Sequence, residues 1–171
     1  MASIADVFDL GQLRLSSGEG RRLELDVRVD PLELAGQRYS AGPGPHRVVL
    51  DVSHTTSGYS LRLRYDVRLH GPCWKCLEDA DAPISVDARE VDQPGGGDDM
   101  RSPYVEGNEL DLRSWAKDAL ALALPQRILC REDCAGLCVE CGANLNEAGP
   151  EHRHEQPATS PFAKLNELKL D

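Results

Sequence analysis

The sequence predicts an α+β fold in which an antiparallel β-sheet, or a partly closed β-barrel, packs against one helix and precedes a cysteine-rich C-terminal segment. Three features of the 171-residue chain predict this fold. Its first half alternates apolar and polar residues, one amphipathic helical pattern follows at 112–124, and all six cysteines lie in two short segments. The hydrophobic content of 40% is enough for a packed core.

The first half of the chain has the two-residue periodicity of half-buried strands. The alternating apolar residues are Leu23, Leu25, Val27 and Val29 in one run, and Leu61, Leu63, Tyr65, Val67 and Leu69 in another. Shorter strands are expected at 48–52 and 84–88, and a glycine- and proline-rich loop at 41–45. Because one face of such strands meets water, we expect a twisted antiparallel sheet or a partly closed barrel.

One helix is predicted over 112–124, where apolar residues recur at three- and four-residue spacing. Asp111 is placed to cap its first turn, and Pro125 ends it. Its apolar stripe is expected to pack on the sheet. A short terminal helix is predicted at 159–171, where Ser160 and Pro161 have the pattern of a cap and a first helical turn.

The cysteine spacing predicts metal binding. Cys73 and Cys76 form one C-x-x-C motif, and the other cysteines follow in a cluster: Cys130, Cys134, Cys138 and Cys141. Zinc takes four thiolate or imidazole ligands in a tetrahedron, and a C-x-x-C turn supplies two of them from one loop. Asp6 and Asp9 stand where a signal peptide would be basic and then apolar, and no apolar run is long enough for a bilayer. We therefore expect a cytoplasmic protein without a membrane partner, in which thiols stay reduced.

Two histidines close behind the cysteines raise the candidate ligands to eight, enough for two zinc ions. The first possible pairing groups Cys73, Cys76, Cys130 and Cys134 across the helix, and Cys138, Cys141, His152 and His154 locally. A second pairing joins the two C-x-x-C motifs, as in a zinc ribbon, and a third uses only the four clustered cysteines in a single site. In their polar segment the histidines are also compatible with solvated side chains. The chain then divides into a β-rich domain at 1–129, a zinc-knuckle segment with a polar linker at 130–158, and the terminal helix at 159–171.

The net charge of −10 belongs to the second half, since residues 1–72 carry nine acidic and nine basic side chains. Within that neutral part, the predicted strand at 61–70 presents Arg62, Arg64 and Arg68 on one face, interrupted by Asp66. Arginine pairs with phosphate through its planar fork, so these three are candidate nucleic-acid-binding residues. The neutral local balance also fits an ordinary solvated sheet face.

Sequence signals of an enzyme are scarce. The chain lacks a phosphate-binding glycine motif, a serine elbow and a metalloprotease histidine pair. The C-x-x-C pair leaves a thiol- or zinc-dependent enzyme or a redox protein as the alternative function, although a turn at Gly71 and Pro72 precedes Cys73 where a redox motif would follow a strand directly.

Four segments, in this order, resemble the YceD family of large ribosomal RNA subunit accumulation proteins. They are Cys73-Trp-Lys-Cys-Leu-Glu78, the helical stretch 112–125, the cluster 130–146 with its Gly-Leu-Cys-x-x-Cys-Gly-x-Asn-Leu-Asn pattern, and the segment 161–168. The resemblance implies a bacterial cytoplasmic protein, not an established enzyme, that supports accumulation of the large-subunit 23S ribosomal RNA. It implies the six cysteines as metal ligands, and a ribosomal RNA precursor or ribosomal protein as partner. Many relatives carry two further cysteines where this chain has His152 and His154.

Overall fold

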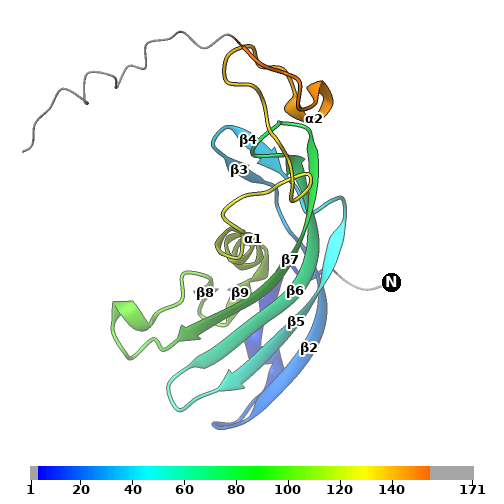
Figure 1. Ribbon diagram of the computed structural model, residues 1–171. Helices are drawn as coiled ribbons and strands as arrows, with labels where there is room; N and C mark the ends of the chain where they lie inside the picture. The colour runs from blue at the N-terminus through cyan, green and yellow to red at the C-terminus, as the bar shows by residue number, and fades with distance from the viewer. Residues whose placement is uncertain (1–3, 155–171) are drawn as a thin grey trace, which may run out of the picture.

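The computed structural model of the protein describes residues 4–154, which form a long curved sheet with one main helix against it (Figure 1). The sheet has the order β2-β5-β6-β7, and each neighbouring pair is antiparallel. Its strands are β2 (Gly20–Arg28), β5 (Pro45–His54), β6 (Tyr59–Pro72) and β7 (Asp79–Asp92). The predicted α+β class with an antiparallel sheet is confirmed.

The alternative prediction, a partly closed barrel, is wrong. Within residues 4–154, β2 and β7 are the two edges of the four-stranded sheet and do not pair with each other. About eight strands are needed before a barrel interior can hold a layer of side chains. Here the concave side is covered instead by the helix α1 (Leu112–Leu122), so the core lies between sheet and helix (Figure 1).

The predicted alternation places the core correctly on the two central strands. The apolar residues of β6 at 61, 63, 65, 67 and 69 are all buried, as are those of β5 at 48, 50 and 52. The predicted strand at 84–88 is the middle of β7, which is much longer. Its first part buries Ala80 between acidic neighbours, and a small alanine gives little periodic signal.

Helix α1 begins as predicted and ends two residues earlier, at Leu122. The Asp111 carboxylate accepts a hydrogen bond from the backbone N–H of Ser114 at 2.9 Å, which caps the first turn. The buried face consists of Leu112, Trp115, Ala116, Ala119 and Leu120. The Tyr65 hydroxyl, which projects from β6, donates to the carbonyl of Ala116 and fixes the helix on the sheet.

Smaller elements complete the fold. A three-stranded sheet has the order β1 (Val7–Asp9), β9 (Glu109–Asp111), β8 (Val105–Glu106), while β3 (Leu32–Leu34) and β4 (Gln37–Tyr39) form a hairpin. The remaining elements are two 3-10 helices, η1 (Leu10–Leu13) and η2 (Asp98–Met100), and the short helix α2 (Leu145–Ala148). The predicted helix at 159–171 lies outside the described residues. Within 4–154, each helix is too short or too polar to cross a lipid bilayer.

Candidate metal centres

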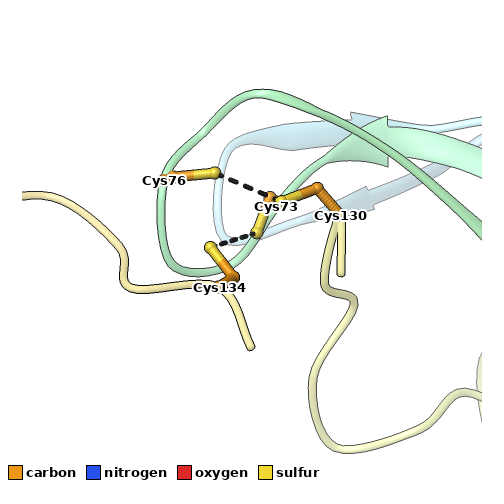
Figure 2. Close-up of side chains that lie close together, drawn as sticks. All are labelled: Cys73, Cys76, Cys130 and Cys134. Carbon is orange, nitrogen blue, oxygen red and sulfur yellow. Dashed lines mark hydrogen bonds between the residues drawn. The ribbon is translucent and has the colours of Figure 1, made fainter. Parts of the chain in front are cut away.

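Four cysteines from two distant parts of the chain converge at one end of the large sheet. Cys73 and Cys76 lie in the turn between β6 and β7, and Cys130 and Cys134 lie in the segment that follows α1 (Figure 2). The sulfurs of Cys73 and Cys134 are 3.8 Å apart, and those of Cys76 and Cys130 are 3.6 Å apart. All four sulfurs lie within 4.8 Å of one another. The first of the three pairings predicts this group, and we call it the first site.

The turn that carries Cys73 and Cys76 is shaped by its own backbone. The Cys73 N–H donates to the Glu78 carbonyl at 2.7 Å, and the Leu77 N–H donates to the Cys73 carbonyl at 3.0 Å. The Lys75 N–H points at the Cys73 sulfur, 3.5 Å away. Gly71 is required just before the turn, because a Cβ there would lie 2.3 Å from the Tyr39 ring.

Contacts beside the sulfurs hold the two segments of the first site together. The backbone N–H of Trp74 donates to the Ile128 carbonyl at 2.8 Å, and the Lys75 ammonium donates to the Cys134 carbonyl at 2.9 Å. Gly136, at φ 83°, passes so close to Lys75 that an added Cβ would lie 3.2 Å from the Lys75 carbonyl oxygen. Hydrogen bonds within the protein therefore hold the two segments, and with them the four thiols, close together.

The four thiols of the first site differ in acidity. Burial opposes ionisation of Cys73, but N–H groups of Cys76, Cys130 and Lys75 directed at its sulfur lower its pKa to about 6. The Asn146 amide lowers the pKa of Cys134. Burial raises the pKa of Cys76, and burial together with the neighbouring thiols raises that of Cys130 to about 12. Cys73 and Cys134 are therefore the thiols of the first site that ionise most readily.

A second group of four, which we call the second site, is local in the chain and closer to solvent. Cys138, Cys141, His152 and His154 place their ligand atoms within 4.8 Å of one another. The Cys141 sulfur is 3.5 Å from Nε2 of His152, and Nε2 of His152 is 3.0 Å from Nε2 of His154. Nδ1 of His154 faces the Glu140 carboxylate at 3.4 Å, which orients that ring. The N–H groups of Cys141 and Glu140 and the His152 ring lower the pKa of Cys138 to about 6.

The turn of the second site is a tight knuckle that depends on one glycine. The Cys138 N–H donates to the Ala143 carbonyl at 2.8 Å, and the Gly142 N–H donates to the Cys138 carbonyl at 2.9 Å. Gly142 has φ 72°, a left-handed conformation that favours glycine.

Asn146, in the segment that follows the second site's knuckle, contacts the first site, a role that the sequence reasoning missed. Its side-chain oxygen accepts from the Ala135 N–H at 2.8 Å, and its amide nitrogen lies 3.5 Å from the Cys134 sulfur. The same nitrogen donates to the Asn144 side chain at 2.8 Å. In the sequence, the Asn-Leu-Asn pattern behind the knuckle is the feature that corresponds to this contact.

The three arginines predicted to meet nucleic acid lie on β6, each against a carboxylate of a neighbouring strand. Arg62 makes two hydrogen bonds to Asp87, at 2.7 and 2.5 Å. Arg64 donates to Asp51 at 2.7 Å, and Arg68 makes two contacts with Asp81 at 2.9 and 3.0 Å. Of these three, Arg62 engages its carboxylate through two nitrogens, whereas Arg64 uses Nη2 and both contacts of Arg68 come from Nε. Sequence reasoning saw only Asp66, because partners on other strands are not neighbours in the chain.

Comparison with known proteins gives a family match over most of the chain. A family model described as "Large ribosomal RNA subunit accumulation protein YceD" matches residues 61–169. An uncharacterized protein of Mycobacterium tuberculosis is 35% identical over 104 residues, which cover 57% of this chain and 49% of that protein. An uncharacterized protein of Mycobacterium leprae is 40% identical over 66 residues, covering 38% of this chain and 29% of that protein.

A plant relative carries the same family description. The Zea mays protein named "Large ribosomal RNA subunit accumulation protein YCED homolog 1, chloroplastic" is 26% identical over 125 residues, covering 73% of this chain and 42% of that protein. The chain spans about half the length, or less, of the curated relatives described here. No solved structure matches it.

Proposed function

The chain belongs to the YceD family of large ribosomal RNA subunit accumulation proteins, and from this membership we propose that it is a zinc-binding, non-enzymatic factor supporting accumulation of 23S ribosomal RNA. The match over residues 61–169 is the observation that carries the ribosomal part. That region includes both groups of candidate ligands. The factor would act in the synthesis, processing or stability of the RNA.

The geometry of both sites supports zinc as the metal. Zn–S bonds of about 2.3 Å in a tetrahedron place two sulfurs about 3.8 Å apart. The sulfur pairs of the first site lie 3.8 and 3.6 Å apart. In the second site the distance from sulfur to nitrogen is 3.5 Å, close to the roughly 3.6 Å that mixed zinc ligands require. The eight residues Cys73, Cys76, Cys130, Cys134, Cys138, Cys141, His152 and His154 are the proposed ligands.

The number of ligands favours a structural role for the metal over catalysis. Each site offers four protein ligands, which complete a zinc tetrahedron and leave no position for a water or a substrate. A redox or thiol enzyme built on the Cys73–Cys76 pair would need an accessible thiolate there, whereas Cys73 is fully buried despite its lowered pKa. Zinc would therefore stabilise the end of the sheet by tying the β6–β7 turn to the segment behind α1.

The proposed partner is a large-subunit RNA precursor or a ribosomal protein in the cytoplasm. The acidic second half of the chain suits a basic ribosomal protein. The cationic surface groups of the chain suit RNA phosphate. Arg62, Arg64 and Arg68 stay a prediction as RNA contacts, and their carboxylate partners count against them. Charge reversal of Arg62 and Arg64 should weaken cosedimentation with subunit precursors if the prediction holds. Unchanged cosedimentation would remove this strand from the interface.

Depletion of the protein in its bacterial host tests the proposed function. The ratio of 23S to 16S ribosomal RNA should fall, and large-subunit precursors should accumulate in sucrose gradients. The wild-type gene should restore the ratio, whereas a gene carrying Cys73→Ser and Cys134→Ser should not, because the first site would lose two ligands. An unchanged RNA ratio after depletion would contradict the proposal.

A further inference from the structure

A pocket of about 290 Å³ opens beside the first site and is not used by either metal centre. Its apolar lining includes Leu34, Tyr39, Trp74, Leu77, Leu124 and Ile128. The lining comes from the β3–β4 hairpin, the β6–β7 turn and the segment after α1. Cys73 belongs both to this lining and to the first site, so the metal centre forms part of the pocket wall. We call it the Trp74 pocket.

Trp74 is the most unusual residue of this pocket, because 60% of its surface is exposed to solvent. The other tryptophan of the chain, Trp115, is buried in the core. The Arg127 guanidinium carbon lies 4.8 Å from the centre of the Trp74 ring, a cation–π contact that holds the indole in place. An indole held in this way is an oriented aromatic surface on which another planar ring can stack.

The charges around the pocket differ from those elsewhere in this acidic chain. Among the residues that line it, none is Asp or Glu, and Gln37 and Gln126 supply neutral amide groups. Arg127, whose guanidinium lies over the Trp74 ring, is exposed, and within residues 4–154 it forms no ion pair with a carboxylate. On the sheet, by contrast, Arg62 and Arg68 face carboxylates closely.

We propose that the Trp74 pocket binds an unpaired base of RNA, with the base stacked on the Trp74 indole and Arg127 beside the adjoining phosphate. This inference rests on the proposed function and names the surface through which the protein meets its RNA. Unpaired bases stack on aromatic rings and guanidinium planes, and side-chain amides read their edges. A pocket near the lower end of small-ligand sites in size suits one planar group rather than a folded surface.

An apolar side chain of a basic ribosomal protein is the competing occupant, and the charges disfavour it. Such a partner would carry lysines and arginines to the edge of the pocket, where Arg127 would repel them. The same cation attracts phosphate. The phosphate backbone of a single strand thus fits both the apolar lining and its cationic edge.

Fluorescence anisotropy of a short labelled oligouridylate, with a duplex of the same length for comparison, tests the proposal on the whole metal-loaded chain. Trp74→Ala should weaken binding of the single strand at least about fivefold, the lower range for loss of one stacked base. Trp74→Phe should restore most of the affinity, since it keeps an aromatic face. Arg127→Ala should reduce the slope of log affinity against log salt by about 0.7, the value for one phosphate contact of a single strand.

Arg47→Ala is the matched control, because it also removes one arginine, but one that is paired with Glu24 and Asp26 on the sheet and is not a candidate RNA contact. It should leave affinity and salt slope unchanged. Zinc content and thermal unfolding of every variant must equal those of the wild type, which separates loss of the pocket from loss of the fold. Since Arg127 is exposed, its variant keeps the test valid even if Trp74→Ala disturbs the turn.

Three results would overturn the inference. They are equal affinity of wild type and Trp74→Ala for the single strand, tighter binding of the duplex than of the single strand, and loss of binding to extracted ribosomal proteins rather than to RNA in Trp74→Ala. If depletion lowers 23S RNA but Trp74→Ala still binds RNA normally, only this inference fails. If depletion leaves 23S RNA unchanged, the proposed function fails whatever the binding data show.

Discussion

The two groups of candidate ligands have similar chemistry, but the chain builds them in opposite ways. In the first site, Cys73 and Cys134 are 61 residues apart in sequence and both are buried. In the second site, Cys141 and His152 are 11 residues apart, and Cys141 is exposed. The first site therefore links segments that are distant in the chain, whereas the second site holds only its own loop in place.

The energetic consequence follows from chain entropy and burial. A link between distant segments restricts the unfolded chain more than a local link does. The first site also shares its turn with the end of β6 and with the Trp74 pocket, so its loss would disturb both. Loss of the second site leaves the core between sheet and α1 in place.

The largest expected effect is that of Cys134→Ser. The variant loses one ligand of the first site and leaves three thiols, of which Cys73 and Cys76 are buried, around an incomplete metal, so we expect a loss of about 4 kcal/mol or more in unfolding free energy. Denaturant titration followed by circular dichroism measures it. Cys141→Ser is the matched variant in the second site and should cost less than half as much. Equal losses would break the comparison between the sites.

Alkylation of the metal-free protein at pH 7 should separate the two sites kinetically. Cys138, with a pKa of about 6, is mostly thiolate, whereas Cys130, with a pKa of about 12, stays protonated. Cys138 should therefore react more than about a hundredfold faster with iodoacetamide, as peptide mass spectrometry would record.

The same assay carries a pH dependence. Because the pKa of Cys138 is lowered, its thiolate persists down to about pH 6, and its reactivity should fall about tenfold per pH unit only below that value. Saturating zinc should protect both thiols. Equal rates at Cys138 and Cys130 without metal would contradict the assigned acidities.

Asn146→Ala should have an intermediate effect, since Asn146 contacts the first site from the segment behind the second. It removes the acceptor of the Ala135 N–H and the amide beside the Cys134 sulfur, for an expected cost of about 1–2 kcal/mol. Zinc affinity should fall in the first site more than in the second. Asn146→Asp, which keeps the acceptor alone, should recover part of the stability. A loss confined to the second site would reverse the role assigned to Asn146.

The smallest effect is expected for Asp51→Asn, a substitution on the sheet away from both sites. Hydrogen bonds from Arg22 lower the pKa of Asp51, so its stabilisation is present above the unfolded-state pKa near 3.8 and is lost as pH falls through the lower folded value. We expect a loss below about 1 kcal/mol at pH 7 that shrinks as the pH falls below 3.8. Unfolding titrations of the variant and the wild type at several pH values measure this change, and at pH 7 both proteins should hold two zinc ions.

Much of the fold could be predicted because its signals are local. The alternation on β6 and the cap at Asp111 depend on neighbouring residues, and the structure places them as expected. The full length of β7 was missed because Ala80 and Ala82 give weak periodicity. The β3–β4 hairpin has only three residues in each strand, too few for a periodic signal.

The sequence predicted which residues are candidate ligands, but not how these ligands are grouped into sites. Cysteine spacing identified the candidate ligands, but three pairings stayed open because spacing does not say which distant segments meet. The structure groups them as in the first pairing. The carboxylates opposite Arg62 and Arg68, and the Trp74 pocket, depend on contacts between segments far apart in the chain. No local pattern encodes such contacts.

Zinc per chain, measured by mass spectrometry of the native protein, tests the central claim of two separate metal sites most directly. The wild type should hold two ions. His152→Ala combined with His154→Ala should hold one, and Cys73→Ser combined with Cys76→Ser should also hold one, because each pair of changes removes half of a single site. One ion in the wild type, or two ions in the double-histidine variant, would contradict the account.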